Sequence, residues 1–144
     1  MNQLNRSAQQ RALASRAEEY VADILISQSW RIVARNYRWI GTEIDILAVK
    51  ESSLVAVEVK FRTRFTHDMT SVSGLMPRLK VQSLKKGLHA AIRYFGINAA
   101  KTRIDLAIVT HQADVSETKM PSGKSPEGIK SYPFKVTWYP AIDA

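Results

Sequence analysis

Hydrophobic and polar positions follow two different periods along the chain, and these periods predict the order of its helices and strands. Residues 7–28 and 78–95 carry apolar side chains three and four positions apart, as one face of a helix does. Shorter segments rich in β-branched and aromatic residues predict strands. These strands cover residues 30–39, 43–49, 54–62 and 103–110, and a short edge strand covers 134–139 between two prolines.

Two polar segments interrupt this pattern and predict loops. Residues 63–74 contain a turn signal at Ser73 and Gly74, and residues 112–132 are rich in Ser, Pro, Gly and Lys without any period. The predicted order is therefore α-β-β-β-α-β, followed by a long flexible loop and a last strand. The 144 residues suit a single domain with one core. Three consecutive strands, a crossover helix and a further strand predict an α/β fold, a mixed sheet flanked by helices.

Acidic side chains and one lysine gather on two of the predicted strands. Because alternate residues of a strand share a face, Glu43 and Asp45 lie together on one strand, and Glu58 and Lys60 do so on the next. The opposite faces are predicted core: Ile44, Ile46, Val55, Val57, Val59 and Phe61. Antiparallel pairing would bring the polar faces together, and half-buried carboxylates require a counter-ion. A divalent cation held by Asp45 and Glu58 meets that requirement.

Composition excludes several classes of protein and favours others. The chain has no cysteine, which excludes disulfides and thiolate zinc sites, and no apolar run approaches the ~20 residues of a membrane span. Its N-terminus is polar and lacks the apolar stretch of a secretory signal, so we expect a cytoplasmic protein with no membrane partner. A net charge of +8 and a pI of about 9.9 favour a polyanionic partner such as DNA.

Basic residues are concentrated where they would surround the acidic cluster. The second predicted helix carries no acid between Leu79 and Asn98, whereas a solvated face usually mixes both signs. An all-basic face indicates contacts with phosphate groups. The candidate nucleic-acid-binding residues come from this helix, from the first strand and from the end of the third strand: Arg38, Arg62, Arg64, Arg78, Lys80, Lys85, Lys86 and Arg93.

Several short motifs appear along the chain in a fixed order: Ala17-Glu18, WRIVARNYR at 30–38, Glu43-Ile44-Asp45, VEVKFR at 57–62, and Arg103-Ile104-Asp105. Together they resemble the YraN family of small bacterial proteins, over roughly residues 15–110. That family comprises predicted endonucleases similar to archaeal Holliday junction resolvases. The Asp…Glu-x-Lys spacing likewise resembles the catalytic signature of the PD-(D/E)xK nucleases. The resemblance implies a restriction-endonuclease-like fold.

The chain departs from the family pattern at three positions. Ala17 and Thr42 stand where the family usually has Gly, and Phe61 stands where it usually has Thr. These changes leave each candidate metal ligand in place. A glycine at position 42 would let another group come close to the backbone, and the threonine side chain restricts that approach. The departures therefore affect fine geometry more than chemistry.

Strand geometry and the resemblance together assign roles to four residues. Asp45 and Glu58 are expected to hold Mg²⁺ or Mn²⁺, because Mg²⁺ prefers a few carboxylates plus waters. Lys60 would orient the attacking water or offset the charge that develops on phosphate. Glu18 lies at the margin of its helix's apolar stripe, where it can reach the sheet edge, and the family places its helix acid there. Each role has an alternative. Asp45 and Glu58 could simply face solvent, Lys60 could form a salt bridge to one of them, and Glu18 could be an ordinary glutamate at the boundary of the apolar stripe.

The remaining polar residues of these motifs have less direct predicted roles. Glu43 ranks below Asp45, as a supporting residue or as a partner of Arg38. Asp105 is expected in a structural salt bridge at the start of its strand. The three histidines are scattered without zinc-site spacing, although His67 in the predicted loop could approach the site.

The sequence thus predicts a magnesium-dependent endonuclease that hydrolyses phosphodiester bonds in DNA, with branched or repair intermediates as candidate substrates. Two alternatives stay open. One is a non-catalytic nucleic-acid-binding module that retains the nuclease fold. The other is a protein-interaction domain in which the acids and lysine form a structural salt-bridge cluster. A homodimer would suit a junction resolvase, but no feature of the chain fixes the oligomeric state.

Overall fold

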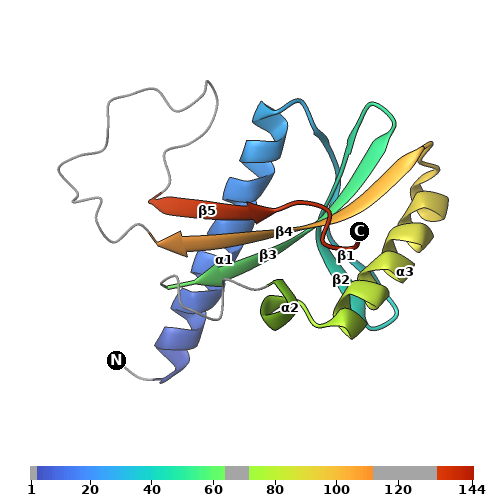
Figure 1. The fold of residues 1–144 in the computed structure, drawn as a ribbon. Helices are drawn as coiled ribbons and strands as arrows, with labels where there is room; N and C mark the ends of the chain where they lie inside the picture. Colours follow the sequence, from blue (N-terminus) through green and yellow to red (C-terminus); the bar gives the residue numbers. More distant parts are fainter. Residues whose placement is uncertain (1–2, 64–71, 112–132) are drawn as a thin grey trace.

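The computed structural model describes residues 3–63, 72–111 and 133–144, and Figure 1 shows their arrangement. The elements follow in this order: α1 (Gln3–Ser27), β1 (Arg31–Trp39), β2 (Thr42–Lys50), β3 (Ser53–Arg62), α2 (Val72–Leu75), α3 (Arg78–Phe95), β4 (Lys101–His111) and β5 (Phe134–Tyr139). The predicted order of long helices and strands is confirmed. The predicted loop at 112–132 lies outside the described residues.

The described strands form one five-stranded sheet with the order β1-β2-β3-β4-β5. The first three strands are an antiparallel meander, β4 runs parallel to β3, and β5 pairs antiparallel with β4. A parallel pair needs a crossover connection, and α3 lies on that connection. The mixed sheet and the edge position of β5 were both predicted, and both are confirmed.

The prediction of a loop throughout 63–74 is wrong at its end, because α2 occupies Val72–Leu75. The backbone N–H of Met76 donates to the Val72 carbonyl at 2.8 Å, and the Met76 side chain is buried in the core. Burial of Met76 outweighs the turn preference of Ser73 and Gly74 in this segment. Arg64 and His67, for which roles were predicted, lie outside the described residues.

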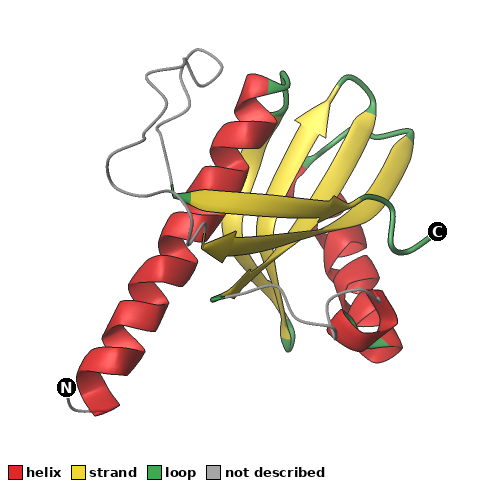
Figure 2. Cartoon of the chain, turned by 60° about the vertical axis from the view of Figure 1, so that its left-hand side comes forward, coloured by secondary structure: helices red, strands yellow, loops and turns green. Residues whose placement is uncertain are grey.

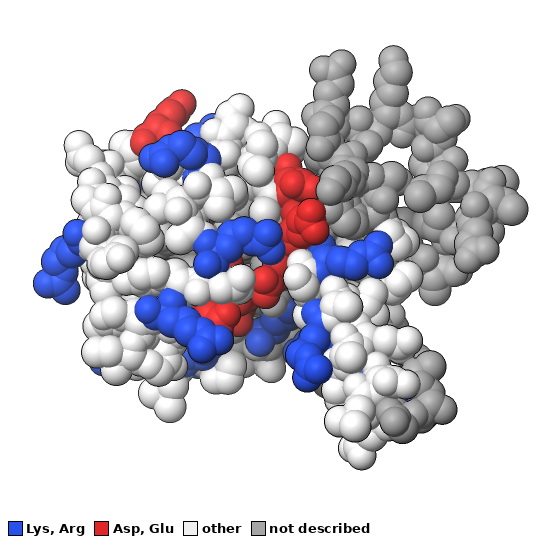
Figure 3. All heavy atoms as spheres, turned by 180° about the vertical axis from the view of Figure 1, so that it is seen from behind, with Lys and Arg blue, Asp and Glu red and all other residues white. Residues whose placement is uncertain are grey.

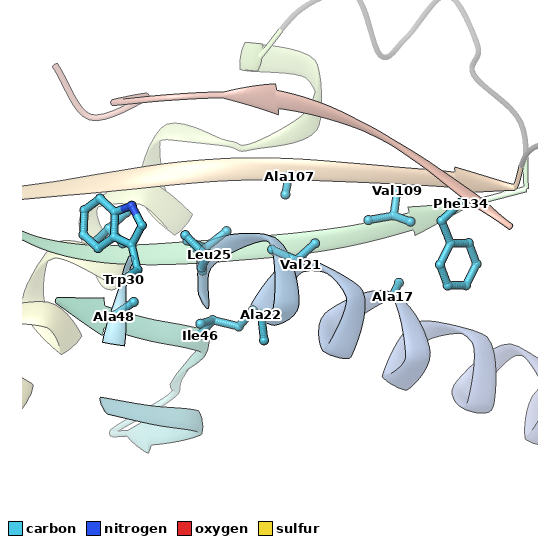
Figure 4. Packing of buried hydrophobic residues seen from close by; sticks show 12 residues of the cluster. Ala17, Val21, Ala22, Leu25, Trp30, Ile46, Ala48, Ala107, Val109 and Phe134 are labelled. Carbon is cyan, nitrogen blue, oxygen red and sulfur yellow. The ribbon is translucent and has the colours of Figure 1, made fainter. Parts of the chain in front are cut away.

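Helices cover both faces of the sheet, as Figure 2 shows. On one face α1 packs through Ala17, Val21, Ala22 and Leu25, and Figure 4 shows these side chains against the strands. On the other face α3 packs through Leu84, Leu88 and Ala91. The central strands are therefore buried on both sides. No helix in the described parts of the chain is both long and apolar enough to cross a membrane.

The prediction that Ile44 and Ile46 share a face is wrong. Ile46 packs in the cluster on the α1 side, together with Val55 and Val57. Ile44 packs in the cluster on the α3 side. Residues two apart lie on the same face only in a regular strand, so β2 is irregular at the intervening Asp45.

Strand β1 is irregular beside the same point. Asn36 lies between two residues that pair with Ile44 and Ile46, and it has a left-handed φ of +54°. A second irregularity shifts the register between Ile32 and Ala34. Asparagine tolerates left-handed φ better than most residues, which explains how the strand continues through Asn36.

Asp105 joins the end of the chain to β4. Its carboxylate has no exposed surface and lies 3.1 Å from the Arg103 guanidinium. It also accepts hydrogen bonds of 2.9 Å from Trp138 Nε1 and from the Ala141 backbone N–H. The predicted structural salt bridge at Asp105 is confirmed, and the additional donors make this carboxylate a junction between β4, β5 and the segment after β5.

Removing this carboxylate should destabilise the fold. Asp105→Ala leaves the part-exposed Arg103 guanidinium and two further donors without their acceptor, so the free energy of unfolding should fall by about 3 kcal/mol. Asp143→Ala is the milder control, because it removes a single 2.9 Å bond to the Ile104 N–H and should cost about 1 kcal/mol. Urea unfolding followed by circular dichroism measures both. Equal stability of Asp105→Ala and the wild type would contradict a structural role for this residue.

Candidate functional site

Asp45 and Glu58 come together where β2 and β3 stop pairing. The pairing of the two strands ends at Ile46 with Val57, one position before the two acids. Asp45 Oδ2 turns toward β3 and accepts a 2.9 Å hydrogen bond from the Val59 backbone N–H. The two carboxyl groups are also within hydrogen-bonding reach of each other. The irregularity of β2 at Asp45 thus directs its side chain toward Glu58.

Burial makes this acid pair electrostatically unfavourable. Glu58 is only 9% exposed, and burial, followed by the charge of Asp45, raises its pKa to about 7. Burial also raises the pKa of Asp45, against the opposing effect of the Val59 N–H bond. Glu58 Oε2 is buried and has no hydrogen-bond partner among the described residues. The pair therefore holds a proton readily, and one of its oxygens is free to accept a cation.

Two lysines act on this acid pair from different elements. The charges of Lys80, on α3, and of Lys60, on β3, both lower the pKa of Glu58, although burial outweighs them. Lys80 also acts on Asp45. Within the described residues, Lys60 forms no ion pair with either carboxylate at 4.0 Å or less. The direct salt bridge weighed as an alternative role for Lys60 is thus not present.

Glu18 and Glu43 form a second acidic group beside the first. Glu18 reaches from α1 to the sheet edge, where its Oε2 lies 3.8 Å from the Arg35 guanidinium. Burial raises the pKa of Glu18, and the charge of Asp45 adds to the shift. Glu43 pairs with Arg38 at 3.5 Å, as predicted. The structure thus brings Glu18 into the electrostatic range of Asp45, on the side away from Lys80.

Asn36 connects these two acids, and the sequence did not single it out. With its amide nitrogen turned toward the acids, it donates to Glu43 Oε1 at 3.2 Å and to Glu18 Oε2 at 3.3 Å. Its signal in the sequence was an asparagine within a strand pattern, a residue that is rare in strands and tolerates left-handed backbone. Asn36 fixes the spacing of Glu18 and Glu43 across β1.

Four of the predicted nucleic-acid-binding residues line two different grooves of the structure. Arg38 and Lys80 lie beside the acids and line a groove of about 550 Å³ there. Arg78 and Lys85 instead line a groove of about 520 Å³ with α2 and residues 142–144. Three further predicted residues are exposed on β3 or α3: Arg62, Lys86 and Arg93. Figure 3 shows one face of the molecule, on which acidic side chains lie among basic ones.

The acid pair fits a hard divalent cation. Mg²⁺ usually takes one or two protein carboxylates and keeps several waters, so Asp45 and Glu58 are a sufficient ligand set. In the described part of the chain, no group of three or more His, Asp or Glu side chains is arranged to hold a metal. A closed, fully protein-coordinated site is therefore not what these residues form, whereas an open one with exchangeable waters matches their number.

The fold and the acid pair define an α/β protein with a buried carboxylate site at the divergence of two strands. The chain belongs to the uncharacterised protein family UPF0102, whose model matches residues 17–109. This membership confirms the YraN-like family that the motifs predicted. A UPF0102 protein of Flavobacterium johnsoniae is 37% identical over 87 residues, 60% of this chain and 69% of the relative. One from Paenarthrobacter aurescens is 35% identical over 97 residues, 67% of this chain and 78% of the relative.

The raised pKa of Glu58 predicts a stability profile that depends on pH. Its pKa rises from an ordinary 4.5 to about 7 in the folded chain. Between these values the unfolded chain has lost the Glu58 proton and the folded chain keeps it, so folding takes up a proton. The free energy of unfolding should therefore fall as pH rises from about 4.5 to about 7. Glu58→Gln cannot titrate and should flatten that slope in urea unfolding without divalent metal.

Glu51→Gln is the matched control, because Glu51 lies exposed in the turn between β2 and β3. It should keep the wild-type slope. An unchanged slope in Glu58→Gln would mean that the folded chain does not hold the Glu58 proton in this range.

Proposed function

We propose that the protein is a metal-dependent endonuclease that hydrolyses phosphodiester bonds in DNA, with a restriction-endonuclease-like fold and a site of the PD-(D/E)xK type. One observation carries the proposal: partly buried Asp45 and buried Glu58 lie together with raised pKa values next to two lysines, and one Glu58 oxygen has no partner among the described residues. Two buried acids that repel each other are costly to stability, and a bound divalent cation offsets that cost. The net charge of +8 supports a polyanionic substrate.

The residues of the site divide the work of hydrolysis among them. Asp45 and Glu58 would hold Mg²⁺ or Mn²⁺, which supplies Lewis-acid stabilisation of phosphate charge. Lys60 has no carboxylate within 4.0 Å in the described part of the chain, and it would hold the attacking water or offset negative charge in the transition state. Water adds to phosphorus and gives up a proton to solvent, and the leaving oxygen departs with the electron pair of the broken P–O bond and takes a proton from solvent. Glu18, kept in position by Arg35 and Asn36, would accept a hydrogen bond from water at the site.

Two observations weigh against a purely structural salt-bridge cluster. Such a cluster pairs each acid with a cation, and the pKa of its acids is lowered by that pairing. Here the pKa of both Asp45 and Glu58 is raised, and Lys60 pairs with neither of them. A non-catalytic DNA-binding module is the second candidate, because the cationic groove beside the acids would bind DNA without any chemistry.

Divalent cations should stabilise the folded protein. Mg²⁺ and Mn²⁺ relieve the repulsion between Asp45 and Glu58 and bind only the folded state, so the melting temperature should rise with metal concentration. Asp45→Asn and Glu58→Gln should each abolish that rise. Differential scanning fluorimetry with and without EDTA measures it.

Glu43→Gln serves as the matched control for this experiment. Glu43 lies near Asp45 but pairs with Arg38, so its variant should keep most of the metal response. A wild-type melting curve that millimolar Mg²⁺ and Mn²⁺ leave unchanged would rule out the metal site proposed for these two acids.

Replacing Lys60 should separate cleavage from binding. Lys60→Ala should keep DNA affinity within a few-fold of the wild type, because one lysine among many basic residues adds little to backbone binding. Cleavage should slow on the order of 10²–10³-fold, since a group that stabilises developing charge acts only in the transition state. Nicking assays on linear, flapped and branched DNA, beside binding curves, measure both quantities.

Lys101→Ala, at the exposed start of β4, controls for the loss of one positive charge and should cleave normally. If Lys60→Ala cleaves at the wild-type rate, Lys60 has no catalytic role. If the wild type cleaves no DNA with either metal, the non-catalytic module is the better description.

A further inference from the structure

The groove beside the acids has a feature that phosphate binding alone does not use. It is lined by residues 38–43, at the tip of the β1–β2 hairpin, and by Lys80 of α3. The tip is apolar: Ile40 is 85% exposed, and Trp39 beside it is partly exposed. Gly41, with a left-handed φ of +74°, turns the chain next to Ile40 and has no neighbour within 4 Å of an added Cβ. Ile40 and Gly41 therefore have open space around them, while Trp39 is partly covered.

Two residues connect the groove with the Asp45–Glu58 pair. Lys80 lines the groove and acts electrostatically on both Asp45 and Glu58. Glu43 lines the groove too and lies two residues before Asp45 on β2. A strand of nucleic acid with one phosphate at the carboxylates would therefore place a neighbouring nucleotide in this groove.

The base of the hairpin is fixed although its tip is free. Thr42 is only 7% exposed, and its methyl group faces α3 at Gly87, where an added Cβ would lie 3.6 Å from it. The close approach of α3 to β2 holds the hairpin at a set distance from Lys80. A rigid base with an exposed apolar tip presents the tip to a ligand at low entropic cost.

We propose that the groove binds an unpaired nucleotide next to the phosphate at the carboxylates, with its base against Trp39 and Ile40. Arg38 and Lys80 contact its flanking phosphates. Arg38 has an exposed partner in Glu43 at 3.5 Å, and an exposed ion pair of this kind is weak enough to yield to a phosphate. This assignment rests on the proposed nuclease function and names the form of strand that the site accepts.

The chemistry of bases explains why the nucleotide is unpaired. In a duplex each base is stacked on its neighbours, so its faces are unavailable to a side chain. An unpaired base exposes both faces, and stacking on an aromatic side chain is tolerant of sequence. Arg38 and Lys80 outnumber Glu43 among the charged residues of the groove, which favours a polyanion over a protein segment as the occupant.

Binding without cleavage tests the proposal. In EDTA, a short single-stranded oligonucleotide should quench the fluorescence of Trp39, whereas a duplex of equal length should quench it much less. The other two tryptophans report little of the groove, because Trp30 is buried and Trp138 is bonded to Asp105. Trp39→Phe should remove most of the signal.

DNA affinity of a tip variant then tests whether the hairpin tip contacts the unpaired nucleotide. Ile40→Ser should weaken binding of the single strand about tenfold, the scale of one lost base contact, and leave duplex affinity within about twofold. Leu4→Ser is the matched control, because Leu4 is 78% exposed on α1 and lies outside the groove. It should change neither affinity. Circular dichroism of both variants verifies that each is folded.

Each other outcome overturns the assignment. Equal losses for single strand and duplex would mean that Ile40 contributes to general binding. If Ile40→Ser loses affinity for neither DNA form, the unpaired nucleotide binds elsewhere. If the variant instead changes the mass of the protein in sedimentation, the hairpin tip is a contact between copies of the chain. These binding results are independent of cleavage. If the wild type binds the oligonucleotides as expected but never cleaves DNA, the proposed nuclease function is refuted and the proposed binding of an unpaired nucleotide in the groove stands.

Discussion

The burial of two acids on the central strands is the constraint on which the site depends. Helices cover both faces of the sheet, and on its strands Glu58 is buried and Asp45 is partly buried. A carboxylate there loses hydration that only a proton, a hydrogen-bond donor or a cation can replace. The Val59 N–H, Lys60 and Lys80 supply part of that compensation, but Glu58 Oε2 has no partner among the residues that the structure describes. The same enclosure that stabilises the sheet therefore leaves this carboxylate oxygen without compensation, which is the reason a cation is proposed there.

Hydrophobic periodicity was sufficient to predict the framework of this fold. The apolar stripe of α3 is strong and that of α1 is weaker, and residues of each stripe reappear on the buried face of the helix. Family motifs and strand periodicity also marked Asp45 and Glu58, although the irregularity of β2 that turns Asp45 toward Glu58 was not predicted. The helical wheel placed Glu18 correctly at the sheet edge, where it meets Arg35. Predictions of this kind succeed when an element is regular and its neighbours follow in sequence.

Other features arise only from packing between distant segments. Strict alternation failed at Ile44 and Ile46, because β2 is irregular where it leaves β3. The approach of Lys80 to the acids depends on how α3 lies against β2, which no local pattern encodes. The donors that reach Asp105 from Trp138 and Ala141 likewise come from beyond a segment of 21 residues, 112–132, that the structure does not describe.

The irregularities of β1 also govern how this sheet meets other molecules. An edge strand exposes unpaired N–H and C=O groups, which can template the addition of a foreign strand. In β1 a register shift and a left-handed Asn36 interrupt the straight run of backbone that such addition needs, and three exposed arginines (Arg31, Arg35 and Arg38) add repulsion. The distortion that sets the spacing of Glu18 and Glu43 thus also protects the protein against growing into an intermolecular sheet.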